Sequence, residues 1–168
     1  RLVWGFVGGH WSRFTHFLYG PTTIWRYLRG HGAPEHGVGH NPLGFLSVLG
    51  LLGFTLLQVA TGLFSDDEIA TSGPLSKFAT GEWVNRASDY HTDIGKFILL
   101  ALVFLHLAAI VFYRVKKGQN LVTPMVWGDK QTELGVPSAR DDLATRLLAI
   151  GVLALSGGAV AALLIWAA

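Results

Sequence analysis

The chain has 168 residues, of which 51% are hydrophobic and 14% are charged, and its formal net charge is +2. An average soluble domain has about 25% charged residues, so this composition indicates a membrane protein with several spans. The absence of cysteine excludes disulfides, thiolate metal sites, iron–sulfur clusters and thioether attachment of a haem. The basic residues cluster at the ends of apolar segments, which argues against a nucleic-acid partner.

Residues 1–40 combine aromatic and arginine side chains with five histidines (His10, His16, His31, His36 and His40). The part around Pro21 predicts a short amphipathic helix at the membrane interface, because Trp25, Arg26 and Tyr27 are favoured at the level of the lipid headgroups. Asn41 followed by Pro42 predicts the start of a helix, with Asn41 as the N-cap and Pro42 at the first helical position.

Three apolar segments have the length of about 20 residues that a membrane-spanning helix needs. They are Leu43–Phe64, Ile94–Tyr113 and Leu143–Ala167, and we expect the second span to begin near residue 92. In the first, small residues recur at intervals of three, which predicts a face that another helix or a flat macrocycle can approach closely (Gly44, Ser47, Gly50 and Gly53). Residues 65–93 are expected to form an acidic loop. The predicted fold class is therefore an all-α membrane protein.

The distribution of lysine and arginine predicts the orientation in the membrane, because cytoplasmic loops carry the excess of positive charge. Residues 1–40 contain four such residues and residues 114–146 contain six, whereas the loop between the first two spans has only Lys77 and Arg86. Residues 1–40 and 114–146 are thus expected on the cytoplasmic side. Residues 65–91 and the C-terminus are expected on the periplasmic side of a bacterial inner membrane.

His91 and His106 belong to the same apolar segment, where histidine is costly and indicates function. Their interval of fifteen residues corresponds to roughly 22 Å along an α-helix and roughly 60° around it. Neutral imidazole is an axial ligand of haem iron, so one helix could hold a cofactor near each side of the bilayer. The alternatives are a buried, hydrogen-bonded histidine for His106 and an ordinary interfacial histidine for His91.

Of the N-terminal histidines, only His40 is a candidate for cofactor binding, because it immediately precedes the first span and could reach a haem propionate or a quinone head group. The other four are expected to be solvated or interfacial. The acidic run Asp66–Glu68 is expected to be a solvated loop rather than a cation site.

Several motifs together resemble the prokaryotic cytochrome b561 family, which includes the b-type subunits of nickel–iron hydrogenases. The similar segments begin with RLVWGFVG at residue 1, Arg13-Phe, Tyr19-Gly-Pro and GHNPLG at residue 39. They continue with QVATGLFSDD at residue 58, the histidine pair, and KGQNLVTPM at residue 117. The resemblance covers roughly residues 1–130.

The resemblance implies a four-helix bundle that holds two b haems, each with two histidine ligands. His91 and His106 match the two ligands that one helix supplies, and their interval is about one residue longer than the family pattern leads us to expect. The chain begins at what resembles the end of the second helix. We therefore expect an N-terminally truncated member that lacks the two partner histidines. Residues 131–168 are expected to form a cytoplasmic linker and an additional transmembrane helix.

The leading hypothesis is a di-haem cytochrome of the respiratory chain that transfers electrons across or within the membrane, as an electron-transfer protein or oxidoreductase subunit rather than a stand-alone enzyme. Expected partners are quinone, a soluble cytochrome, a dehydrogenase or hydrogenase subunit, and a second copy of the chain. One alternative is a haem-free membrane anchor or assembly subunit of a redox complex. An ion or proton transporter is disfavoured, because the few ionisable residues of the apolar segments, such as Lys96 and the two histidines, do not form a continuous proton path.

Overall fold

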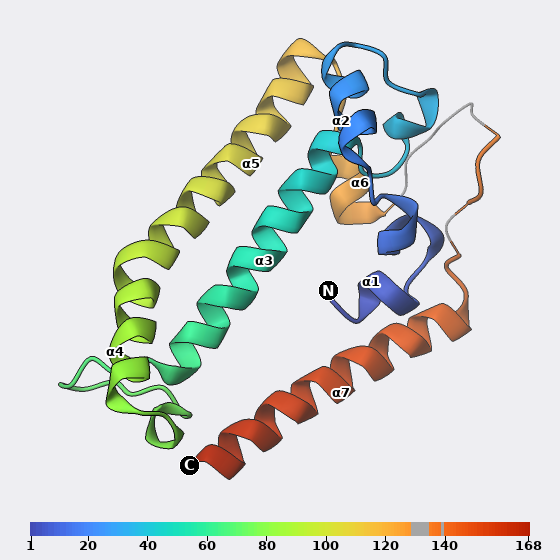
Figure 1. Ribbon diagram of the computed structural model, residues 1–168. Helices are drawn as coiled ribbons and strands as arrows, with labels where there is room; N and C mark the ends of the chain where they lie inside the picture. The colour runs from blue at the N-terminus through green and yellow to red at the C-terminus, as the bar shows by residue number, and fades with distance from the viewer. Residues whose placement is uncertain (129–134, 139) are drawn as a thin grey trace. The chain divides into compact units, whose positions relative to one another are not determined.

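The computed structural model describes residues 1–128, 135–138 and 140–168. These residues form helices connected by loops, and the only pairing of β type among them is an isolated bridge between Asp66 and Ser72. Three helical stretches are long and apolar enough to cross a membrane: Pro42–Phe64, Gly81–Lys116 and Leu143–Ala167 (Figure 1). The expectation of an all-α membrane protein is confirmed.

The first of these stretches, helix α3 (Pro42–Phe64), begins as the sequence predicts. Asn41 Oδ1 accepts a hydrogen bond of 2.7 Å from the backbone N–H of Gly44. This bond satisfies an N–H group that has no partner inside the helix. Pro42 occupies the first helical position, where its missing N–H has no cost.

The second stretch begins earlier than expected. Helix α4 (Gly81–Asp89), the π-helical turn η5 (Tyr90–Gly95) and helix α5 (Lys96–Lys116) follow one another without a break. The prediction of a loop over residues 65–93 is therefore wrong from Gly81 onward. Helix α4 is mostly polar and carries an exposed i,i+4 ion pair between Glu82 and Arg86, so a search for apolar length does not detect it.

The third stretch, helix α7 (Leu143–Ala167), has the predicted bounds. Most of its large apolar side chains are exposed, as expected for a helix that faces lipid. The predicted domain boundary between residues 130 and 131, and Lys130 in the charge count, lie outside the described residues.

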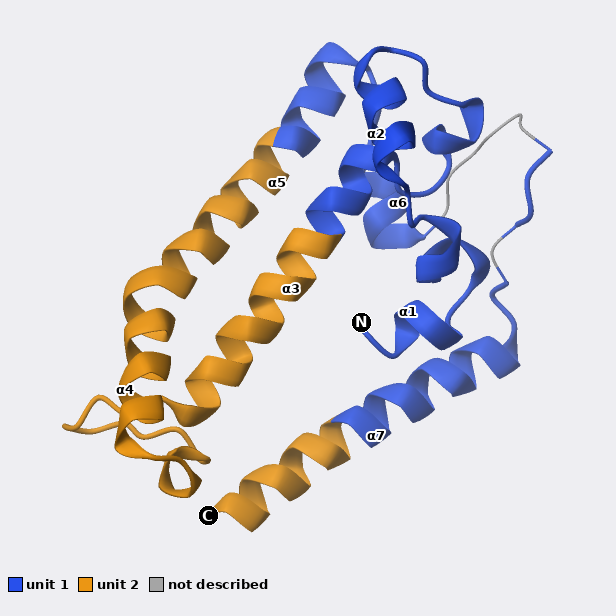
Figure 2. Ribbon diagram, in the orientation of Figure 1, with its two compact units in different colours: residues 1–48, 109–156 blue, residues 49–108, 157–168 orange. Residues whose placement is uncertain are grey.

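Contacts divide the chain into two compact units (Figure 2). The first comprises residues 1–48 and 109–156, and it includes α1 (Trp4–Val7), α2 (Pro21–Leu28) and α6 (Val122–Trp127). Phe17, Pro42 and Phe45 are its buried apolar centre. The amphipathic helix expected around Pro21 is α2, which confirms that prediction of secondary structure.

The second unit comprises residues 49–108 and 157–168. Here the remainder of α3 packs against η5 and α5 in antiparallel fashion, because Gly50 faces Leu102 and Gly62 faces His91. The loop after α3 contacts the end of α7, where the rings of Phe78 and Trp166 stack with centroids 4.8 Å apart. His91 and His106 both belong to this unit.

Candidate functional site

The imidazole of His91 is fixed by the backbone of α3. Its Nδ1 lies 2.9 Å from the carbonyl oxygen of Gln58, whereas Thr61 Oγ1 is farther away, at 3.5 Å. A carbonyl oxygen only accepts hydrogen bonds, so Nδ1 carries the proton of a neutral His91 ring. The lone pair is then on Nε2. Metal-binding histidines commonly donate their other N–H to a carbonyl in this way.

Gln58 contacts His91 a second time through its side chain. Gln58 Nε2 donates a hydrogen bond of 2.9 Å to the carbonyl oxygen of His91. The other amide atom, Gln58 Oε1, is buried and accepts no hydrogen bond from the described residues, and it lies against the Cα of Gly95. Gln58 is therefore bonded to His91 twice. Its backbone carbonyl accepts from the ring, and its side-chain amide donates to the His91 backbone.

Gly62 brings α3 close to the His91 ring. A Cβ atom at residue 62 would lie 2.7 Å from His91 Cε1, which is closer than real Cβ contacts, and 3.1 Å from Nδ1, which is tight. Glycine at this position thus allows the carbonyl of Gln58 to reach the imidazole. Of the other small residues of α3, Gly50 faces Leu102, whereas a Cβ at Gly53 would meet no described atom within 4 Å.

His106 lies on α5 in an apolar environment. It is partly exposed, and neighbouring side chains with large exposed fractions are Val103, Phe104, Leu105 and Leu107. These exposed apolar residues are suited to contact lipid, another helix or an apolar cofactor rather than water. Among the described residues, no group of three or more histidine, cysteine or acidic side chains could hold a metal ion.

The π-helical turn changes the geometry expected for the histidine pair. A π-turn closes its hydrogen bond from i to i+5, so it holds one residue more than an α-turn. Since His91 lies near the start of η5, the fifteen-residue interval corresponds to about fourteen α-helical positions. The estimate becomes roughly 21 Å along the axis and roughly 40° around it. His91 and His106 are still expected on a similar face of the helical stretch. The stretch is not a uniform α-helix, as the first estimate assumed.

His40 belongs to the other unit. Its ring packs on Phe17 with centroids 4.6 Å apart, and its carbonyl oxygen accepts a hydrogen bond of 2.9 Å from the Tyr19 hydroxyl. His40 is therefore embedded in the aromatic centre of its unit. The structure does not bring it together with His91 or His106 in one unit.

A cluster near His40 was not predicted from the sequence. The hydroxyl of Tyr113 lies 3.0 Å from that of Tyr27, and it accepts a hydrogen bond of 3.0 Å from Asn41 Nδ2. Burial raises the pKa of Tyr27 above its ordinary value, and the bond to Tyr113 raises that pKa further. The only sequence signal was that each tyrosine lies near a predicted helix end, where this residue type is common.

In the acidic loop, the carboxylate of Asp67 is hydrogen-bonded to the backbone of the same loop. Asp67 Oδ1 accepts hydrogen bonds from the backbone N–H groups of Ile69, Ala70 and Thr71. These bonds, with Thr71 the strongest, lower the pKa of Asp67 to about 2. The arrangement closes the loop.

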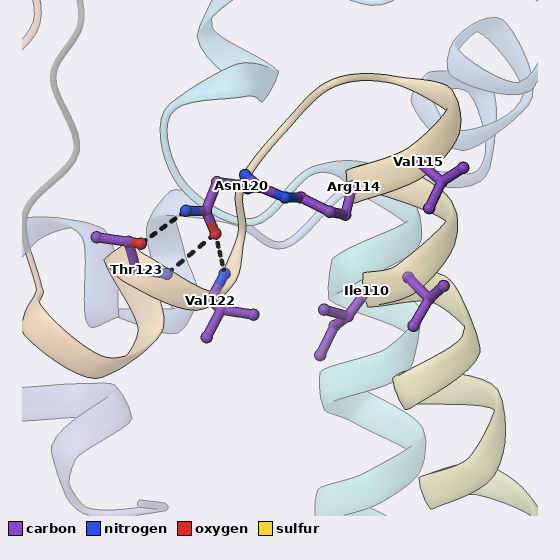
Figure 3. A pocket seen from close by; sticks show the side chains of 7 residues that line it. Ile110, Arg114, Val115, Asn120, Val122 and Thr123 are labelled. Carbon is purple, nitrogen blue, oxygen red and sulfur yellow. Dashed lines mark hydrogen bonds between the residues drawn. The ribbon is translucent and has the colours of Figure 1, made fainter.

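A pocket of about 380 Å³ lies where α5 ends and α6 begins, all within the first unit (Figure 3). Its walls are mostly aliphatic, and its polar members are Arg114, Asn120 and Thr123. Asn120 Nδ2 donates to Thr123 Oγ1 at 2.7 Å, and Asn120 Oδ1 accepts from the N–H of Val122 at 3.1 Å. The pocket combines apolar walls with one cation, which suits an apolar ligand with a polar or anionic end.

Comparison with known proteins identifies the family. A model of prokaryotic cytochrome b561 matches residues 1–128. The chain belongs to the prokaryotic cytochrome b561 family. A probable Ni/Fe-hydrogenase B-type cytochrome subunit from Bradyrhizobium diazoefficiens is 29% identical over 151 residues, covering 78% of this chain and 59% of the relative. The chain thus spans less than two thirds of this relative, and no solved structure matches it.

Membership confirms the resemblance inferred from the sequence, and it implies haem b as the cofactor. The residues present fit this group. His91 has its Nδ1 bonded to a carbonyl and its Nε2 free of that bond, which is the state in which imidazole binds iron. His106 is set among apolar side chains, which suit the hydrophobic faces of a porphyrin.

Proposed function

We propose that this cytochrome carries electrons across the membrane through two b haems, with His91 and His106 each supplying one axial ligand. The second ligand of each haem is proposed to come from another helix of the family's bundle. The single observation that supports this most strongly is the bond between His91 Nδ1 and the Gln58 carbonyl. It leaves Nε2 as the nitrogen that can bind iron.

The chain's own residues would perform three tasks. His91 and His106 would bind iron at positions roughly 21 Å apart along one helix. Gln58 and Gly62 would orient the His91 ring, and the aliphatic neighbours of His106 would exclude water from the second site. When bound, haem b supplies one-electron redox chemistry between ferric and ferrous iron.

The proposed orientation follows from the basic residues, which are concentrated in residues 1–40 and 114–146. These segments would face the cytoplasm of a bacterial cell, and the loop before α4 and the C-terminus would face the periplasm. His91 would then lie on the periplasmic side of the inner membrane and His106 toward the cytoplasm. The electron path would run from one face of the bilayer to the other.

The proposed partners are quinone in the bilayer and a redox enzyme at the membrane surface. The Bradyrhizobium diazoefficiens relative is described as a probable subunit of a Ni/Fe-hydrogenase, which favours an enzyme of this kind as the partner of the present chain. His40 remains a proposed contact for a haem propionate or a quinone head group. The pocket beside Arg114 is a second location where such a polar end would fit.

Electron transfer can be measured in liposomes that contain the full-length protein and enclose ferricyanide. A reduced quinone analogue is added outside, and reduction of the enclosed ferricyanide is followed by its absorbance. We expect reduction with the wild-type protein, and loss of at least 90% of the rate in His91→Ala and in His106→Ala. His31→Ala, which changes an exposed histidine, is the matched control and should retain the wild-type rate.

Haem content decides between the proposal and its main alternative. A protein that contains haem and reduces the enclosed ferricyanide supports electron transfer across the membrane. A protein that is purified without haem from a haem-producing host, with both histidines intact, would overturn the proposal and favour a membrane anchor. Wild-type rates in both histidine variants would also overturn it.

A further inference from the structure

We propose that the π-helical turn Tyr90–Gly95 accommodates one additional residue so that His91 stays in register with His106, and that Gln58 is the positioning residue that holds this turn. The inference rests on the proposed function for its meaning, because register matters only if both histidines bind a cofactor. It adds a role for the turn and for the Gln58 side chain, and it can be tested in part on the protein without haem.

The backbone of the turn departs from the regular hydrogen-bond ladder of an α-helix. Where an α-helix changes to a π-turn and back, the i→i+4 ladder is interrupted, and a backbone carbonyl loses its usual partner. Gln58 Nε2 donates to the carbonyl oxygen of His91, which lies within the turn, at 2.9 Å. A side chain of α3 thus supplies a hydrogen bond to η5. Loss of this donor would leave the turn with one hydrogen bond fewer to its backbone.

Helix α3 and the turn η5 approach each other closely. Gly95, the last residue of the turn, is buried, and a Cβ there would lie 2.6 Å from Tyr90 Cε1 and still closer to Gln58 Oε1. On α3, a Cβ at residue 62 would likewise collide with the His91 ring. The turn, Gln58 and the imidazole therefore form one closely packed group that no side chain can enter.

The turn also sets the register between His91 and His106. The extra residue of the turn lies between His91 and His106, so it changes the angular difference from roughly 60° on one side to roughly 40° on the other. Without the turn, His91 would be rotated by about 100° relative to α5. The carbonyl of Gln58 could not then bind Nδ1 at the present position. The turn thus reconciles a fifteen-residue interval with a fourteen-residue geometry.

Two single-residue deletions in the full-length protein test this account. Deletion of Thr92, an exposed residue inside the turn, should convert the turn to α-helix and leave the register of the histidines unchanged. Deletion of Ala101, an exposed residue between the turn and His106, is the matched control, because it shortens the chain equally but leaves the turn in place. We expect the Thr92 deletion to retain both haems and the Ala101 deletion to lose one.

Gln58→Leu tests the positioning role. We expect it to change the electron paramagnetic resonance signal and the midpoint potential of one haem only, since Gln58 bonds to His91 and His106 lies fifteen residues farther along the chain. In the background of the Thr92 deletion, the same substitution should have less than half of this effect, because the His91 carbonyl then has an α-helical partner. Thr61→Val removes a hydroxyl that lies 3.5 Å from His91 Nδ1 and donates to the carbonyls of Leu57 and Gln58. It keeps both bonds between Gln58 and His91, so it should change the signals less than Gln58→Leu does.

The inference is overturned if the two deletions lose haem equally, or if Gln58→Leu changes neither haem signal or both. If the wild-type protein contains no haem, the proposed function fails, and thermal unfolding tests the turn separately. Gln58→Leu should then lower Tm in the wild-type background and have a smaller effect after deletion of Thr92. Equal decreases of Tm in both backgrounds would show that Gln58 does not hold the turn.

Discussion

Gln58 and His91 are joined by two hydrogen bonds of 2.9 Å that run in opposite directions. The His91 ring donates to the carbonyl of Gln58, and the side-chain amide of Gln58 donates to the carbonyl of His91. The first bond fixes the tautomer of the ring, and the second fixes the backbone from which the ring projects. Together they give one candidate ligand a defined orientation before any metal is bound.

The close approach at Gly62 predicts a site-specific effect of a small substitution. In Gly62→Ala the added Cβ would lie 2.7 Å from His91 Cε1, so the imidazole must move away from the Gln58 carbonyl. We expect the haem content to fall by one haem per protein, measured from the reduced-minus-oxidised spectrum.

Gly53→Ala is the matched control on the same helix, because a Cβ there has open space. It should keep the wild-type spectrum. Equal haem loss in both variants would indicate a general effect of alanine on α3 and would contradict the role assigned to Gly62.

The N-cap of α3 predicts a graded effect on stability. Asn41→Ala removes the bond to the Gly44 N–H and the bond to Tyr113, and loss of an N-cap alone costs about 1 kcal/mol. Asn41→Asp keeps an acceptor for the Gly44 N–H but no donor for Tyr113. We expect Tm to decrease in the order wild type, Asn41→Asp, Asn41→Ala. A lower Tm for Asn41→Asp than for Asn41→Ala would contradict this assignment.

The tyrosine pair predicts a change in titration. The pKa of Tyr27 is raised first by burial and then by its bond to Tyr113. Tyr113→Phe removes only the second cause, so the pKa of Tyr27 should fall but remain above the ordinary value for tyrosine.

Ultraviolet titration of tyrosinate measures this change, and the same titration of Tyr27→Phe identifies which of the four tyrosines is responsible. An unchanged Tyr27 pKa in Tyr113→Phe would show that the hydroxyl pair does not form.

The loop closed by Asp67 predicts a dependence on pH. The pKa of Asp67 is lowered to about 2 by backbone hydrogen bonds, so the stabilisation is complete above the unfolded value near 4 and is lost as the pH falls through about 2. Hydrogen exchange at Ala70 and Thr71 should therefore accelerate, relative to the intrinsic rate, between roughly pH 4 and pH 2. Asp67→Asn should remove this transition, and its persistence in that variant would contradict the assignment.

Much of the fold follows from the length of the apolar segments. The bounds of α3 and α7 were predicted within one residue, because apolar length and the Asn41-Pro42 start signal are local properties. The beginning of the second helical stretch was not predicted, since α4 is polar and its helix is supported by pairs such as Glu82 with Arg86. A polar helix outside an apolar segment is not detected by apolar length.

The candidate site was predicted less completely than the fold. The pair of histidines is visible in the sequence because ionisable residues are rare in apolar spans. The roles of Gln58 and Gly62 are not, since they depend on how α3 packs against η5. The family resemblance indicates one extra residue in the interval, but only the backbone shows that a π-turn contains it.

The central claim is that His91 and His106 belong to two separate haem sites. It is tested most directly by the haem-to-protein ratio of the purified full-length protein and of its His91→Ala, His106→Ala and doubly substituted variants. The account predicts about two haems in the wild type, about one in each single variant with different residual spectra, and none in the double variant. Single variants that keep the wild-type ratio and spectrum would contradict it.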